Sequence, residues 1–200
     1  MRRSQMKAED IFGKKRLLLA SGSPRRRELT EQLGMEVVRA HLKDVEETYP
    51  DTLSAAEVAP YLSRLKAEAY MGEIAPDEVL LTADTVVVDG DRILGKPRDE
   101  GEAHAMLREL SGHTHQVITG VTLVSDKGMH TFSEVTEVEF AELTDDEISY
   151  YVEKYRPLDK AGAYGIQEWI GYIGIKGIKG DYYNVMGLPL RRVYEHLLKM

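Results

Sequence analysis

The chain has 200 residues, of which 42% are hydrophobic and 30% charged, as expected of one folded globular domain. It contains no cysteine, which excludes disulfide scaffolds, cysteine-based zinc sites and thiol catalysis. A net charge of −8 disfavours a broad nucleic-acid-binding surface, and neither a secretory signal nor a membrane-spanning stretch is evident. We therefore expect a cytoplasmic protein with no nucleic-acid or membrane partner.

The first elements are predicted from the turn chemistry near the N-terminus. Residues 1–15 are polar, and we expect them to form a flexible extension. Residues 16–20 (RLLLA) form a short apolar run typical of a buried strand, and Ser21-Gly22-Ser23-Pro24 follows it directly. Ser23 can cap a helix with proline at its first position, and this helix should extend to about Leu33. The pattern predicts a strand, a tight turn and a helix N-terminus.

Three further helices begin with capping-box spacing, in which a Ser, Thr or Asp precedes a Glu by three positions. The predicted helices are Ser54–Ala69, Asp99–Leu110 and Thr144–Tyr155. Between the first two, residues 79–88 (VLLTADTVVV) indicate a central buried strand, which turns at Asp89-Gly90 and returns through residues 92–94.

The remaining pattern completes an α/β fold. Residues 115–124 and 130–140 should form a long antiparallel hairpin. A glycine-punctuated stretch, residues 162–187, precedes a terminal helix opened by Pro189. The sequence predicts a mixed twisted sheet flanked by helices.

The segment SGSPRRREL is the first candidate for binding chemistry. It places two hydroxyls, several backbone amides and three arginines at the start of a helix, whose dipole favours anions. This arrangement suits a phosphate group, although a capped helix with a solvated basic face has the same composition. Lys66 and Lys96 could bring further cations to a polyphosphate.

Carboxylates and one amide are the other candidates. Asp84 lies within an apolar strand, where a carboxylate is costly unless it is paired, metal-bound or at the mouth of a cleft. It is the best catalytic candidate, and the alternative is an aspartate bonded to loop amides. Glu46 and Glu47 could offer oxygens to a hard divalent ion or form a solvated acidic run. Gln167 could bind a base edge or be a surface amide.

From about Leu17 to Leu197 the chain resembles the Maf family, which has an inosine triphosphatase-like fold. The matching blocks, together with the Glu46 segment, occur in the family's order: SGSPRRREL (Ser21–Leu29), LSRLKA (Leu62–Ala67), ADTVV (Ala83–Val87), ILGKPRD (Ile93–Asp99), LSGHTHQVITGV (Leu110–Val121), DKAGAYGIQ (Asp159–Gln167) and NVMGLPL (Asn184–Leu190). The resemblance implies that residues 16–200 form one Maf-like nucleotide pyrophosphatase domain, elongated and two-lobed, with a central cleft.

The resemblance also implies an activity and its residues. A homodimeric enzyme would cut a nucleoside triphosphate to the monophosphate and pyrophosphate with Mg²⁺ or Mn²⁺. In this interpretation Asp84 is the catalytic carboxylate, which activates water or holds the metal, and Glu46 assists the metal. The phosphates would be bound by Ser21, Ser23, Arg26, Lys66 and Lys96.

Arg25, Thr85 and Gln167 match the branch of the family that prefers dTTP and UTP, and modified pyrimidine triphosphates could also be substrates of such a house-cleaning enzyme. One departure is Glu168, where a small glycine usually follows the glutamine. Two alternatives stay open: a 7-methyl-GTP pyrophosphatase of the sister branch, and a non-catalytic nucleotide-binding regulator of cell division.

Overall fold

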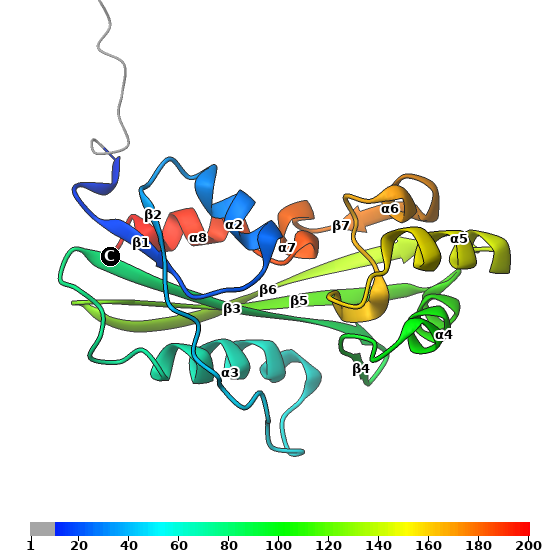
Figure 1. The fold of residues 1–200 in the computed structure, drawn as a ribbon, viewed down its shortest axis with the longest axis horizontal. Helices are drawn as coiled ribbons and strands as arrows, with labels where there is room; N and C mark the ends of the chain where they lie inside the picture. Colours follow the sequence, from blue (N-terminus) through cyan, green and yellow to red (C-terminus); the bar gives the residue numbers. More distant parts are fainter. Residues whose placement is uncertain (1–10) are drawn as a thin grey trace, which may run out of the picture.

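A seven-stranded mixed sheet extends along the molecule and carries helices on both faces (Figure 1). The computed structural model describes residues 11–200. The strands are β1 (Arg16–Leu19), β2 (Val37–Arg39), β3 (Glu78–Asp89), β4 (Arg92–Leu94), β5 (Thr114–Ser125), β6 (Gly128–Phe140) and β7 (Ile175–Lys179). Their order is β2-β1-β3-β5-β6-β7, and β4 pairs separately with β3. The prediction of an α/β fold with a mixed sheet is confirmed.

Four of the helices, those that follow Ser23, Ser54, Asp99 and Thr144, begin close to the positions that the capping pattern predicts. The helices are α2 (Pro24–Glu31), α3 (Ala55–Glu68), α4 (Glu100–Leu110), α5 (Asp145–Tyr155), α6 (Trp169–Gly174), α7 (Tyr182–Met186) and α8 (Leu190–Leu197), with a 3-10 turn η1 (Ala161–Ala163). At the start of α5 the Thr144 backbone N–H donates to Glu147, whose own N–H donates to the Thr144 hydroxyl. The α4 cap is half of this arrangement, because Glu102 accepts from Arg98 instead.

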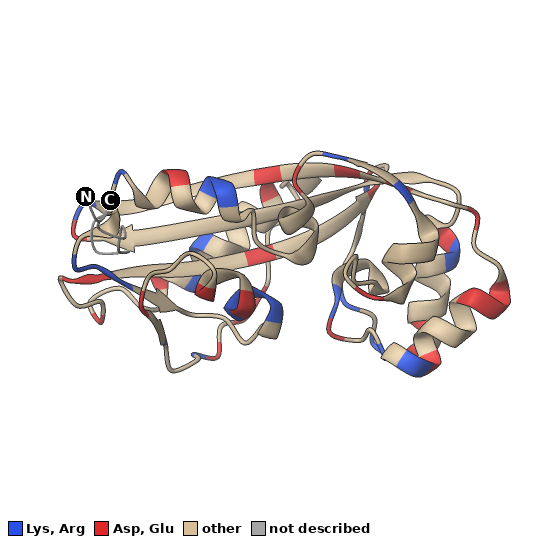
Figure 2. Ribbon diagram, turned by 90° about the horizontal axis from the view of Figure 1, so that it is seen from above, with Lys and Arg blue, Asp and Glu red and all other residues tan. Residues whose placement is uncertain are grey.

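Three long strands, β3, β5 and β6, pair antiparallel and join two lobes (Figure 2). In the first lobe α2 and α8 pack on one face of the sheet, where Leu17, Leu81 and Val193 are buried, and α3 packs on the other face. In the second lobe α4, α5 and α6 pack around Leu107, Tyr151 and Ile170. The two lobes implied by the resemblance are therefore present. The strands β3, β5 and β6 extend from one lobe into the other.

The glycine-rich stretch and the N-terminal extension are the two segments for which the sequence predicts no regular structure. The glycine-rich stretch before Pro189 folds into α6, the edge strand β7 and α7, which ends at Gly187 with a φ of 112°. Residues 1–10 of the predicted extension lie outside the described residues, and Phe12 packs edge-on against Tyr194 of α8. Within the described part of the chain, no helix combines the length and apolar character that a membrane crossing requires.

Candidate active site

A cavity of about 380 Å³ lies where the central strand β3 has no strand partner on one edge within residues 11–200. β1 pairs with β3 as far as Leu81, and β4 pairs with it from Val87. Asp84 and Thr85, between these points, are the two partly exposed residues in the otherwise buried middle of the strand. The gap between β1 and β4 thus opens the sheet edge to a pocket shared by both lobes.

The turn after β1 forms one wall of the pocket. Ser23 is the N-cap of α2 and accepts a hydrogen bond from the Arg26 backbone N–H at 3.4 Å, while Ser21 Oγ accepts from the Ser23 N–H at 3.2 Å. Pro24 follows at the first helical position. Because the turn is fixed by its own side chains, the helix N-terminus faces the cavity with its partial positive charge.

The side chain of Arg26 is already engaged with the pocket wall. It donates to the carbonyl oxygens of Gly187 and Ala83, both at 2.8 Å, and to Thr85 Oγ1 at 3.0 Å. The Ala83 carbonyl belongs to the unpaired edge of β3, so the guanidinium occupies the place of a missing strand. Burial lowers the pKa of Arg26, and nearby Asp84 opposes this shift. Arg26 therefore buttresses the sheet edge as well as lining the pocket.

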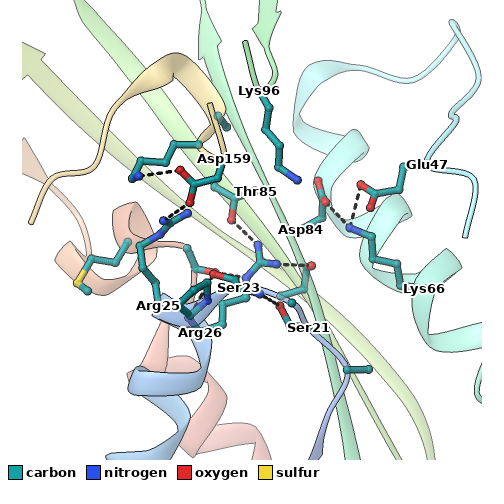
Figure 3. A pocket seen from close by; sticks show the side chains of 18 of the residues that line it. Ser21, Ser23, Arg25, Arg26, Glu47, Lys66, Asp84, Thr85, Lys96 and Asp159 are labelled. Atoms are coloured by element: carbon teal, nitrogen blue, oxygen red, sulfur yellow. Dashed lines mark hydrogen bonds and ion pairs between the residues drawn. The ribbon is translucent and has the colours of Figure 1, made fainter. Parts of the chain in front are cut away.

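Asp84 lies at the centre of a charged cluster (Figure 3). Lys66 Nζ, from the last turn of α3, is 2.6 Å from Asp84 Oδ1 and 3.0 Å from Glu47 Oε2. The side chain of Asp84 is 13% exposed and that of Lys66 is 18% exposed. One ammonium group therefore faces two carboxylates, and Figure 3 shows Lys96 pointing into the same space from beyond β4.

Close packing of α3 on the sheet brings Lys66 to this position. Gly120 of β5 is the direct partner of Asp84, and α3 crosses over it. A Cβ atom built on Gly120 would lie 2.2 Å from Pro60 N and 2.3 Å from Ala59 C. The absence of a side chain at Gly120 is thus what allows the helix to approach.

The opposite side of the pocket is formed by the segment after α5. Arg25 Nη1 donates to Asp159 Oδ2 at 2.9 Å, and Lys160 Nζ donates to Asp159 Oδ1 at 2.7 Å. Burial raises the pKa of Asp159, but the hydrogen bonds from Lys160 and Arg25 outweigh this and hold it below its usual value. This contact links α2 of the first lobe to the second lobe across the pocket.

Gln167 also lines the pocket, and its amide has an open hydrogen-bonding position. Gln167 Oε1 is buried, and among residues 11–200 no donor reaches it. A buried acceptor without a partner is costly in a folded protein. The position therefore suits a ligand group that donates a hydrogen bond.

Comparison with known proteins places the chain in a family. The family model described as "Maf-like protein" matches residues 16–200. The chain belongs to the Maf-like family. A relative from Phocaeicola vulgatus, named dTTP/UTP pyrophosphatase, is 54% identical over 94% of this chain and 97% of its own length. A relative of the same name from Bacteroides thetaiotaomicron is 51% identical over the same shares of the two chains.

One solved structure shares the fold at much lower sequence similarity. A HAM1 protein from Coxiella burnetii superposes with a TM-score of 0.51 and 17% identity, covering 93% of this chain and all of the other. At this identity the likeness concerns the architecture alone.

Most residues expected for a Maf-like site meet in the pocket. Its lining includes Ser21, Ser23, Arg25, Arg26, Lys66, Asp84, Thr85, Lys96 and Gln167. Glu46 is exposed and does not line the pocket, and its neighbour Glu47 does. Asp159 and Lys160 also line the pocket, and the sequence alone gives them no role, although they open the matching block DKAGAYGIQ.

Proposed function

We propose that this protein hydrolyses dTTP and UTP to the nucleoside monophosphate and pyrophosphate in the pocket around Asp84. The observation that carries the proposal is the cluster of Asp84, Lys66 and Glu47 facing the N-terminus of α2. The names of relatives that are about half identical over nearly the whole chain support the same substrates.

The phosphates would bind between the turn after β1 and the two lysines. Ser21, Ser23 and the Arg25 backbone N–H at the start of α2 can donate to phosphate oxygens, and Lys66 and Lys96 can neutralise them from the other side. Phosphoanhydride cleavage depends mainly on charge neutralisation and an oriented water. Asp84, in contact with both Lys66 and the cavity, is placed to orient and deprotonate that water.

A divalent ion fits the donor set of the pocket when the substrate completes it. Within the described residues, no three His, Cys, Asp or Glu side chains gather as a self-sufficient metal site. Asp84 and Glu47 nevertheless approach the same point, the Nζ of Lys66. Mg²⁺ commonly binds through one or two carboxylates plus substrate phosphates, so we propose these two residues as ligands of Mg²⁺ or Mn²⁺. A bound ion would neutralise phosphate charge and lower the pKa of a coordinated water.

The base would lie toward Gln167. Uracil and thymine carry an N3–H donor beside the O4 acceptor, and the unpartnered Gln167 Oε1 offers an acceptor, with the amide nitrogen next to it as a donor. Such a pair of hydrogen bonds would orient a pyrimidine with a protonated N3. Arg25, fixed by Asp159, lines the same side of the pocket.

The products distinguish this reaction from other hydrolyses of a triphosphate. Purified protein with Mg²⁺ and dTTP is followed by phosphorus NMR, and dTMP and pyrophosphate should form in equal amounts. Formation of dTDP and inorganic phosphate would contradict the proposal.

A homodimer, a cytoplasmic location and the lack of a nucleic-acid or membrane partner stay predictions from the sequence. Light scattering of the purified protein measures its mass, and a value of twice 22.6 kDa is expected for the dimer.

A further inference from the structure

A chain of polar contacts continues from the pocket wall into the second lobe. Lys160 Nζ, which bonds Asp159, also pairs with Glu168 Oε1 at 3.1 Å. Glu168 Oε2 accepts a hydrogen bond from the hydroxyl of Tyr151 on α5. The Tyr151 hydroxyl in turn accepts from the backbone N–H of Gly165 at 3.0 Å. This series of contacts thus begins at Arg25 and ends at Gly165, two residues before Gln167.

These contacts are protected from solvent in their inner part. The side chain of Lys160 is 9% exposed and that of Glu168 is 19% exposed, and Tyr151 is fully buried. The charges alternate in sign along Arg25, Asp159, Lys160 and Glu168, so these side chains neutralise one another without a ligand. The side chain of Asp159 is 56% exposed, so the buried part of the set is Lys160, Glu168 and Tyr151, and this part holds its members in one arrangement.

Gly165 is the point where the contacts reach the pocket. A Cβ atom built on Gly165 would lie 3.0 Å from Gln167 Nε2 and 3.0 Å from Glu168 Cδ. Both side chains therefore fold back over this glycine, one toward the pocket and one toward Lys160. A shift of Glu168 would therefore change the packing around Gly165, against which the Gln167 side chain lies.

We propose that Glu168 is a positioning residue, which acts through Lys160 and Tyr151 to hold Arg25 and Gln167 in place for the pyrimidine base. This inference rests on the proposed function and deepens it. Asp84, Lys66 and Glu47 lie on the other side of the pocket and have no contact with Glu168 among those that the structure describes (Figure 3). The residue should consequently affect binding of the base more than the chemical step.

Glu168→Gln is the sharpest substitution because it preserves size. Both oxygens of Glu168 face donors, Lys160 Nζ and the Tyr151 hydroxyl, whereas a glutamine has one acceptor and one donor. One of the two contacts must weaken in either orientation of the amide. The expected effect is a rise of about tenfold in the KM for dTTP with kcat changed less than threefold, the size expected for one lost charged hydrogen bond.

Tyr151→Phe is a second variant that leaves all charges in place. It removes the hydroxyl that joins Glu168 to the Gly165 N–H, and it should raise the same KM by about threefold to tenfold. Glu153→Gln and Tyr150→Phe are matched controls on the same helix, since both positions are exposed. They should leave KM unchanged.

Calorimetric binding of dTMP and of inorganic tripolyphosphate separates base positioning from general damage. Glu168→Gln should weaken dTMP binding about tenfold and leave tripolyphosphate binding within twofold, which a loosened fold would not do. Equal weakening of both ligands, or no weakening of dTMP binding, would overturn the inference. If the unaltered protein binds dTMP but does not cut dTTP, and Glu168→Gln shows this selective loss, only the proposed function fails. If it does not bind dTMP at all, both fail.

Discussion

The two sides of the pocket differ in how their charges are balanced. Around Asp84, one lysine faces two carboxylates, and neither Arg26 nor Lys96 in the same lining has an ion pair among residues 11–200. On the opposite side, Arg25, Asp159, Lys160 and Glu168 alternate in sign and satisfy one another. Charged groups without a fixed partner can bind a metal ion or a phosphate, whereas a set that is satisfied internally holds its members in place. We therefore propose that the chemistry occurs at the first side and recognition of the base at the second.

The largest expected effect comes from neutralising the first side. Asp84→Asn should lower kcat for dTTP at least about a thousandfold, because it removes the group that would orient water and hold the metal. Asp89→Asn, at the end of the same strand, is the control and should retain activity. The measurement is pyrophosphate release at saturating dTTP. An Asp84→Asn variant with more than a tenth of normal kcat would show that the chemistry lies elsewhere.

The packing under the first side predicts a large effect on stability. Gly120→Ala would place a methyl group within 2.4 Å of the backbone of α3, so either the helix or β5 must move. We expect a loss of about 3 kcal/mol of unfolding free energy and a drop in Tm of about 10 °C. Gly177→Ala on β7, where a Cβ meets no atom within 4 Å, is the control. Equal melting temperatures of the two variants would contradict the close packing of α3 against Gly120.

The core of the second lobe contains a histidine that makes the stability of the fold sensitive to acid. His115 is buried and bonds the hydroxyl of Tyr164 at 2.7 Å, and burial lowers the pKa of His115 to about 4. Because the unfolded chain binds this proton from about pH 6.5 downward and the folded chain does not, stability falls as pH decreases from 6.5 to 4.

Titration of this one group should remove about 2 kcal/mol of unfolding free energy between pH 7 and pH 5. Urea unfolding at the two pH values measures the change. His115→Gln should show a flatter dependence, and His113→Gln, which alters an exposed histidine on the same segment, should keep the original slope. A His115→Gln variant with the same slope as the unaltered protein would exclude this origin.

The smallest expected effect concerns the dependence of activity on Mg²⁺, and it distinguishes Glu47, which lines the pocket, from its neighbour Glu46. Glu47→Gln should raise the Mg²⁺ concentration for half-maximal activity about tenfold, since it removes one proposed ligand. Glu46→Gln should leave it unchanged, because Glu46 is exposed and outside the pocket. The reverse result would restore the metal role that the resemblance gives to Glu46.

The elements that the sequence predicts well are those with strong local signals. The apolar run around Asp84 and the capping residues Ser54 and Thr144 predict the bounds of β3, α3 and α5 to within a few residues. By contrast, α6, β7 and α7 lie in a glycine-rich stretch without clear periodicity, and tertiary contacts decide their structure.

The site was predicted where residue type alone is informative. Asp84 is costly in a buried strand, so its position indicated function. Glu46 and Glu47 are equivalent in the sequence, and their irregular segment has no period from which to tell which one faces the pocket. The contacts of Asp159 and Lys160 with Arg25 and Glu168 span up to 134 positions and depend on the meeting of the two lobes.

The most direct test of the account is the substrate preference of the purified protein. Pyrophosphate release with Mg²⁺ is measured for dTTP, UTP, CTP, GTP and 7-methyl-GTP. We predict that dTTP and UTP have the highest kcat/KM, at least about tenfold above the guanine nucleotides. A preference for 7-methyl-GTP, or binding of dTTP without turnover of any nucleotide, would contradict the account.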